Sequence, residues 1–297
     1  MKLVLANNQS QKFVDFYANL GHQSGEAFDY AGYEQLLFTF DGKGLDVRLL
    51  QTGKSIRDYD GVYLSGYLNT YELAAAIAVC LSALHIPFAD AEFANPPSLS
   101  KLSEYAKLAA NEVPIPRTSA GTKKALLAAE LSVQFPQILK RADAARGADN
   151  FKVANMQELH ELLAPHAPRS LWVLQDFVPN DGFWRVTFYG DNEPAFAIFR
   201  AMGERADGDV RKSHIYKPKG GANASLVPMA DVPETVLAAA RAGAAALGRQ
   251  FAGVDIVQDA AGRAYVLEVN YNPQLVTVGT FAEVRAQAFV DGLRKIH

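Results

Sequence analysis

Three oxygen-bearing side chains lie inside apolar segments near the carboxy terminus, in the stretch GVDIVQDAAGRAYVLEVNYNPQ (residues 253–274). Asp255 lies in GVDIV, and Glu268 and Asn270 lie in AYVLEVN. Because side chains alternate between the two faces of a strand, Glu268 and Asn270 share a face. A carboxylate among apolar neighbours is costly unless it has a partner. Two carboxylates and an amide oxygen are hard donors, and they suit Mg²⁺ that bridges phosphates better than a soft metal.

The turn DAAGR between the two apolar runs predicts a hairpin. A plain five-residue loop would pair Asp255 with Leu267, so pairing with Glu268 requires a bulge or a one-residue shift. The alternative, an isolated acid that caps a turn, explains Asp259 but not three donors within strands. We therefore predict that Asp255, Glu268 and Asn270 hold a metal ion.

Several cationic side chains interrupt other apolar strands. Lys140 follows the strand FPQIL and precedes RADAARGADN (residues 141–150), whose small residues and Gly147 favour a phosphate-binding loop with backbone N–H donors. An ordinary hairpin with a solvated lysine is the alternative. Arg185 and Arg200 also require partners, and either phosphate oxygens or an acid in an ion pair would match the fork of a guanidinium group.

The connector QDFVPND (residues 175–181) leaves a buried strand and turns at its proline. Its backbone could contact an adenine edge, with apolar contacts from Phe177 and Val178. Asp176 and Asp181 fit equally well as turn residues.

A basic loop at residues 205–221 ends in two glycines and contains His214, the one histidine that we consider for function. Such a loop could close over developing negative charge, whereas a solvated loop would also be charged.

Composition narrows the class of protein. The chain has 297 residues, a length that suggests about two domains, and its net charge of −3 without a basic arm argues against nucleic-acid binding. Cys80 is the only cysteine, which excludes an intramolecular disulfide and a cysteine-rich zinc site. The apolar run around it has 12 residues, too few to cross a membrane, and the first residues turn polar too early for a signal peptide. We therefore expect a cytoplasmic protein.

The first hundred residues alternate between strand and helix patterns. This alternation predicts a small α/β domain with parallel strand pairing. Ligands of such sheets bind at the carboxyl ends of strands. The residues at those ends are Asn7, Asn8, Ser65, Gly66 and Tyr67. Neither a dinucleotide-binding G-x-G-x-x-G motif after the first strand nor a P-loop is found.

The segment NPPSLSK (residues 95–101) marks a boundary, because paired prolines precede a helix opened by a serine. A central α+β region and a carboxy-terminal antiparallel sheet then follow. The predicted helices are residues 101–112, 156–166 and 234–251, and the predicted strands are 135–139, 151–155, 170–178, 184–190 and 194–202, followed by the hairpin.

Taken in order, these features resemble the ATP-grasp superfamily, and within it the RimK-type ligases that add glutamate to a ribosomal protein. The matching segments extend over about residues 98–281. They are SLSKL, VPIPRT, FPQILKR, LQDFVPNDGFWRV, AIFRAM, KGGANASLV and GVDIV…YVLEVNYNPQ. The resemblance implies α/β and α+β architecture: an ATP-grasp fold with an amino-terminal α/β (pre-ATP-grasp) domain. The expected domains are residues 1–97, a central subdomain at 98–172 and a carboxy-terminal subdomain at 173–297, with ATP between the last two.

The resemblance also implies roles for individual residues. Phosphate contacts fall to Lys101 and Lys140, and the Gly147 loop covers them. The adenine pocket is lined by Gln175, Asp176, Phe177 and Val178. Metal ligation falls to Asp255, Glu268 and Asn270, with one or two Mg²⁺ ions expected and Mn²⁺ as an alternative. The groups that act on the transferred phosphate are Arg200, together with Arg185 and Lys219.

Two positions depart from the family pattern. The loop RADAARGADN has one glycine where many relatives have several. Phe183 stands where related ligases often place the acid that meets the ribose, so either Asp181 replaces that acid or the nucleotide binds less tightly.

The expected activity is that of an ATP-dependent carboxylate–amine ligase, which acts through an acyl phosphate and releases ADP and phosphate. The expected partners are a small-molecule or peptide carboxylate and an amine donor, without nucleic acid or membrane, in a chain that can form homo-oligomers. The alternatives are an ATP-grasp kinase with a stable phosphoryl product and a non-catalytic nucleotide-binding protein.

Overall fold

The computed structural model describes ten segments of the chain and a few single residues. The described segments are residues 1–6, 28–42, 44–64, 70–89, 100–129, 133–142, 149–189, 193–202, 224–249 and 251–270, and the single residues are 11, 14, 15, 281, 284, 288, 289 and 291. The chain forms two compact units. The first comprises residues 1–110 and 117–176, and the second comprises residues 111–116 and 177–297. The division into three domains stays a prediction.

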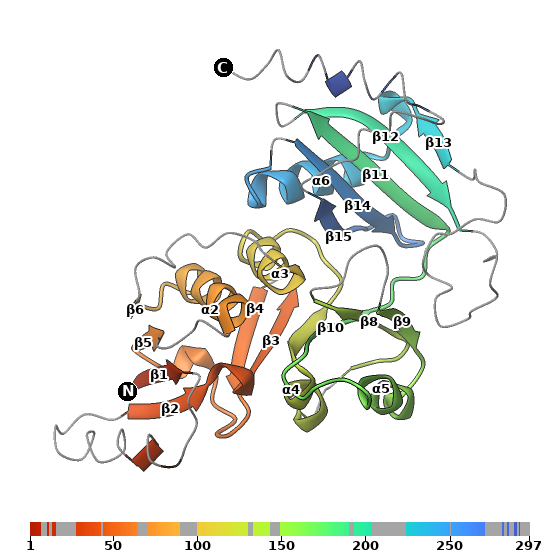
Figure 1. The fold of residues 1–297 in the computed structure, drawn as a ribbon. Coiled ribbons are helices and arrows are strands. Elements are labelled where there is room, and N and C mark those ends of the chain that lie inside the picture. The colour runs from red at the N-terminus through yellow and green to blue at the C-terminus, as the bar shows by residue number, and fades with distance from the viewer. Residues whose placement is uncertain are drawn as a thin grey trace. The chain divides into compact units, whose positions relative to one another are not determined.

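The first unit begins with a four-stranded parallel sheet in the order β2-β1-β5-β6 (Figure 1). Its strands are β1 (Lys2–Ala6), β2 (Phe28–Gly32), β5 (Gly61–Leu64) and β6 (Phe88–Ala89). Parallel pairing in the amino-terminal region is thereby confirmed. Helix α2 (Tyr71–Ala83) follows β5, and its residues 73–81 are all buried, which explains their continuous run of small and apolar side chains.

A six-stranded antiparallel sheet in the order β4-β3-β7-β10-β8-β9 also belongs to the first unit. Its strands are β3 (Leu36–Asp41), β4 (Gly44–Leu49), β7 (Thr118–Thr122), β8 (Gln137–Arg141), β9 (Asn150–Val153) and β10 (Leu171–Asp176). The prediction of parallel pairing is wrong for β3 and β4. They form a tight hairpin and join the central strands through β7, because a two-residue connection can only link antiparallel neighbours.

Besides α2, the described part of the first unit contains three helices and two 3₁₀ turns, and the described part of the second unit contains one 3₁₀ turn. The helices are α3 (Lys101–Ala110), α4 (Lys123–Ala128) and α5 (Met156–Leu163), and the 3₁₀ turns are η1 (Tyr33–Gln35), η2 (Ile56–Asp58) and η6 (Met229–Asp231), the last in the second unit. Asn155 caps α5 by accepting a hydrogen bond from the Glu158 N–H at 3.0 Å. Leu159 and Leu163 of α5 then pack with the buried Trp172 in one core cluster.

The second unit contains a five-stranded antiparallel sheet in the order β13-β12-β11-β14-β15 (Figure 1). Its strands are β11 (Gly182–Tyr189), β12 (Pro194–Ala201), β13 (Ala224–Val227), β14 (Phe251–Gln258) and β15 (Ala264–Asn270). Helix α6 (Glu234–Ala246) packs against β14 and β15. Buried valines at positions 254, 266 and 269 lie beneath Gly243 of this helix, so the opposite face of the sheet is left for polar side chains.

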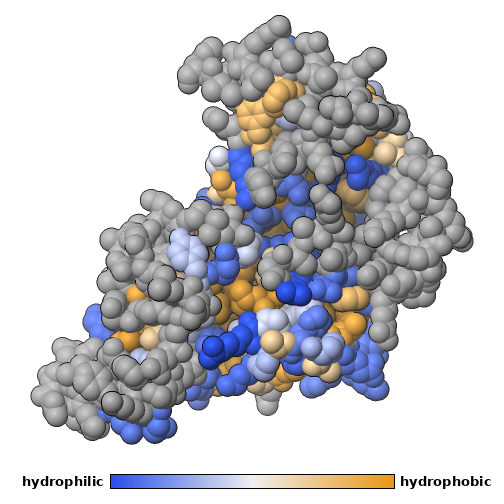
Figure 2. Space-filling model, viewed as in Figure 1, coloured by the Kyte–Doolittle hydropathy of each residue, from blue (hydrophilic) through white to orange (hydrophobic). Residues whose placement is uncertain are grey.

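Hydrophilic and hydrophobic residues are interspersed on the visible face (Figure 2). Among the described residues, the large hydrophobic side chains that are well exposed are Met156, Leu226 and Val284. The described part of the chain contains no helix that is long and apolar enough to cross a membrane.

Candidate active site

The predicted metal-binding side chains gather on one face of the sheet in the second unit. Asp255 of β14 pairs directly with Glu268 of β15, and the register shifts between Asp255 and Ile256. This irregularity confirms the predicted bulge, which leaves Leu267 as the extra residue. The Asn270 amide nitrogen lies 3.4 Å from Asp255 Oδ2, and Gly253 is the cross-strand partner of Asn270. The strand alternation and the pairing together place all three donors on one face.

Arg185 of β11 is the cross-strand neighbour of Asp255 on the other side. Its guanidinium donates two hydrogen bonds to the carboxylate, from Nε to Oδ1 at 2.7 Å and from Nη2 to Oδ2 at 2.6 Å. Burial by itself would lower the pKa of Arg185, but the charge and hydrogen bonds of Asp255 and the charge of Glu268 raise it. Arg185 therefore forms an ion pair with an acid, which is the second of the two partners predicted for it.

Arg200 of β12 pairs with Phe183 of β11, so both lie on the same face as Arg185. The Arg200 Cζ atom lies 5.5 Å from the centroid of the Phe183 ring, within the range of a cation–π contact. The Phe183 ring therefore lies against the guanidinium group of Arg200. The face thus combines two arginines with two acids and an amide.

The chemistry of this donor set fits a hard divalent cation. The described residues contain no group of three or more His, Cys, Asp or Glu side chains suited to a metal, and the set here consists of two carboxylates and one asparagine. Such a set supplies few protein ligands, which is how sites for Mg²⁺ with nucleotide phosphates are built. Arg185 holds both oxygens of Asp255, so the carboxylate is kept in a fixed orientation.

A buried polar network in the first unit surrounds Lys140 of β8. The lysine is only 9% exposed, and its Nζ donates to Gln175 Oε1 at 2.8 Å and to the Tyr105 hydroxyl at 3.2 Å. Gln175 in turn donates from Nε2 to Thr118 Oγ1 at 2.9 Å. Lys140 is therefore not the solvated lysine of an ordinary hairpin. Sequence reasoning missed Tyr105 and Thr118, although Tyr105 lies one helical turn after Lys101.

Lys101 begins α3, and its backbone N–H contacts the carbonyl of Ala142 at 3.5 Å. This contact joins the start of the helix to the residue after β8, so Lys101 lies beside the beginning of the predicted phosphate loop. Asp176 ends β10 and accepts a hydrogen bond from Gln137 Nε2 at 2.7 Å.

The rest of the predicted adenine connector belongs to the second unit. Asn180 donates to the carbonyl of Val178 at 2.7 Å, and Met202 N–H donates to the carbonyl of Asp181 at 2.8 Å. Phe177 lies between Asp176 and Val178 and is half-buried.

Several predicted residues lie outside the described residues. They are Gly147 of the phosphate loop, Lys219 and His214 of the basic loop, and the strand-end residues Asn7, Asn8, Ser65, Gly66 and Tyr67. Their roles stay predictions.

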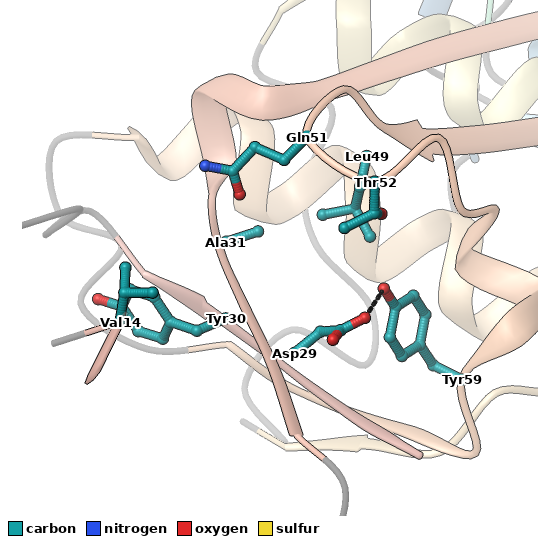
Figure 3. Close-up of a pocket in the computed structure, with 8 residues that line it drawn as sticks. All are labelled: Val14, Asp29, Tyr30, Ala31, Leu49, Gln51, Thr52 and Tyr59. Carbon is teal, nitrogen blue, oxygen red and sulfur yellow. Dashed lines mark hydrogen bonds between the residues drawn. The ribbon is translucent and has the colours of Figure 1, made fainter. Parts of the chain in front are cut away.

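A cavity of about 240 Å³ in the first unit was not predicted (Figure 3). Asp29 and Tyr59 point toward each other there, and the Tyr59 hydroxyl donates to Asp29 Oδ2 at 2.7 Å. Lys54 Nζ donates to the same oxygen at 2.7 Å. Burial and the neighbouring carboxylate raise the pKa of Tyr59. These side chains satisfy one another.

Comparisons with known proteins place the chain in a family. A model of the RimK-like ATP-grasp domain matches residues 100–288, which is more than half of the chain. The chain therefore belongs to the RimK-like ATP-grasp family of ATP-dependent ligases, and its fold is the ATP-grasp fold with mixed helices and sheets. No curated protein matches it.

Solved structures resemble the chain over nearly its whole length. They include a RimK domain ATP-grasp protein from Sphaerobacter thermophilus, with 15% identity, a TM-score of 0.46 and coverage of 99% of this chain and 100% of that one. D-alanine–D-alanine ligase from Bacillus anthracis in complex with ATP has 15% identity, a TM-score of 0.49 and coverage of 99% and 94%. D-cycloserine synthetase has 19% identity, a TM-score of 0.46 and coverage of 99% and 100%.

Proposed function

We propose that this protein is a carboxylate–amine ligase that uses ATP to activate a carboxylate as an acyl phosphate. The observation that carries the proposal is the shared face of Asp255, Glu268 and Asn270, with Arg185 and Arg200 on the neighbouring strands. This arrangement offers hard donors and cations together. Phosphoryl transfer requires positioning and charge neutralisation rather than a protein nucleophile.

In the first unit, Lys101 and Lys140 would bind the ATP phosphates, together with Gly147, which follows β8 and precedes β9 in the sequence. Gln175 and Tyr105 hold the Lys140 side chain in place through hydrogen bonds, so this side chain would need little reorganisation when the nucleotide binds. The backbone from Gln175 to Val178, which runs from the first unit into the second, would contact the adenine, and Asp181 of the second unit would meet the ribose.

In the second unit, Asp255, Glu268 and Asn270 would hold one or two Mg²⁺ ions, or Mn²⁺. When bound, the ion supplies charge neutralisation for the phosphates. Arg185 orients Asp255 through two hydrogen bonds. Arg200 and Lys219 would stabilise the transferred phosphoryl group.

The proposed reaction has two steps. A carboxylate oxygen of the substrate bonds to the γ-phosphorus while the bond from that phosphorus to ADP breaks. An amine then attacks the acyl carbon, phosphate leaves with the bonding electron pair, and the amine loses a proton. We propose a small-molecule or peptide carboxylate as substrate, and a cytoplasmic setting because ATP is abundant there.

The first experiment measures ADP and inorganic phosphate together, with Mg·ATP and pooled amino acids, short peptides and fractionated cell extract. Equal release of both products, dependent on an added fraction, supports the ligase. ADP without matching phosphate would instead indicate a kinase, and absence of substrate-dependent release would contradict both catalytic functions.

A variant tests the metal assignment. Glu268→Gln should abolish ADP formation while the melting temperature without nucleotide stays close to that of the wild type, because the amide keeps the shape but lacks the charge. Glu193→Gln, which neutralises a carboxylate that is 70% exposed, serves as the matched control and should retain activity. Normal turnover by Glu268→Gln would overturn the metal assignment.

A further inference from the structure

Thr118 of β7 belongs to a chain of hydrogen bonds that leads to the Lys140 ammonium, and the proposed reaction gives it no role. Its Oγ1 atom accepts a hydrogen bond from Gln175 Nε2 at 2.9 Å. Thr118 is fully buried and Gln175 is 1% exposed. Water therefore cannot easily replace a partner that is lost from this chain, and each bond in it matters more than it would at the surface.

Strand pairing brings Thr118 and Lys140 to opposite sides of one side chain. Gln175 of β10 pairs with Thr118 on one side and with Ile138 of β8 on the other. Lys140 lies two residues after Ile138, on the same face and diagonal to Gln175, which is a distance that long side chains span. The amide of Gln175 therefore connects β7 to the lysine on β8.

The chemistry of the lysine fixes the orientation of this amide. An ammonium group can only donate, so Gln175 must turn its oxygen toward Lys140, and the two atoms lie 2.8 Å apart. The amide nitrogen then points toward β7, where Thr118 accepts its proton. Thr118 thus supplies the acceptor that this orientation of Gln175 requires.

Tyr105 of α3 holds the same ammonium from a second direction. Lys140 Nζ donates to the Tyr105 hydroxyl at 3.2 Å, and this hydroxyl donates in turn to Gln175 Oε1 at 3.4 Å. The Nζ atom also lies 5.8 Å from the centroid of the Tyr105 ring. The amide and the phenol are uncharged, so neither of them neutralises the ammonium, and together they orient it.

We propose that Thr118 is a positioning residue for the nucleotide phosphates, because it holds Gln175 in the orientation that fixes the Lys140 ammonium. This role rests on the proposed function, in which Lys140 binds ATP. Gln175 also begins the segment proposed to contact the adenine, so the hydroxyl of Thr118 could have served the base instead. Its loss should weaken a ligand with phosphates and leave the affinity for adenosine unchanged.

The test measures the affinities of the full chain for Mg·ATP and for adenosine by titration calorimetry. Thr118→Val keeps the β-branched shape but lacks the acceptor, so we expect it to weaken Mg·ATP binding about fivefold. Thr118→Ser keeps the hydroxyl and should restore nearly the wild-type affinity. Melting curves without nucleotide check the fold of each variant, and Thr118→Ala provides a second variant without the acceptor.

A double variant tests whether Thr118 acts through the lysine. Lys140→Met removes the ammonium and should weaken Mg·ATP binding by about tenfold or more. Thr118→Val added to Lys140→Met should then cause no further loss, because the group that Thr118 positions is absent. A purely structural role of Thr118 would instead give losses that add.

Three results would each contradict the role of Thr118. The first is wild-type affinity for Mg·ATP in both Thr118→Val and Thr118→Ala. The second is equal weakening of Mg·ATP and adenosine, which would assign Thr118 to the adenine contact. The third is additive losses in the double variant. A chain that binds Mg·ATP but releases no ADP with any substrate would contradict the proposed ligase alone, so the two failures are distinguishable.

Discussion

At the level of single residues, Phe183 makes a contact that its departure from the family pattern did not suggest. Its ring lies 5.5 Å from Arg200 Cζ, and strand pairing keeps the two side chains together. Phe183→Leu should therefore lower kcat about fivefold and leave the KM for ATP nearly unchanged, because a cation–π contact contributes about 1 kcal/mol.

Phe183→Tyr is the control for this prediction, because it keeps the aromatic face and should retain kcat. The measurement is steady-state ADP release with varied ATP. If Leu and Tyr at this position gave the same kcat, the ring would not position Arg200. A large rise in KM for ATP alone would indicate nucleotide contact instead.

At the level of the strand pair, Gly182 allows β11 to lie close to β12. A Cβ atom at this position would lie 2.7 Å from Phe199 Cζ and 2.9 Å from the Ala201 Cα atom. Gly182→Ala should therefore displace β12, which carries Arg200, and lower the free energy of unfolding by about 1–3 kcal/mol. Chemical denaturation measures this change.

Gly243→Ala in α6 is the matched control. A Cβ atom there would meet valine side chains at 3.4–3.6 Å, which is ordinary contact, and alanine favours the helix over glycine. We expect equal or greater stability for this variant. Equal stability of Gly182→Ala and the wild type would show that β12 adjusts without cost.

For the molecule as a whole, the change in the free energy of unfolding at low pH is a sum of contributions from many charged groups. Asp29 is one of these groups. Burial by itself would raise the pKa of Asp29, but hydrogen bonds from Lys54 and Tyr59 and the Lys54 charge lower it below its ordinary value of 3.8. The folded state therefore binds this proton less readily than the unfolded state. The stabilisation is present above about pH 4 and is lost as the pH falls through the lowered pKa.

Asp29→Asn should consequently show a weaker loss of stability below about pH 4 than the wild type does. Denaturation curves at a series of pH values test this slope. Lys54→Met removes the main cause of the lowered pKa and should flatten the slope in the same way. An unchanged slope in both variants would exclude Asp29 as a contributor.

Much of the candidate catalytic face could be predicted from the amino-acid sequence alone. The two-residue spacing of Glu268 and Asn270 determines a shared face in any strand, and the turn between the apolar runs required the bulge that pairs Asp255 with Glu268. Such features are local, because covalent geometry and strand alternation produce them within a few residues.

Partner choice was decided only by the tertiary structure. Arg185 binds Asp255 across 70 residues, and Lys140 binds Gln175 and Tyr105 across 35 residues each. The antiparallel pairing of β3 with β7 likewise joins distant segments. Local patterns show that a buried charge requires a partner, but which partner it meets depends on how packing brings separate elements together.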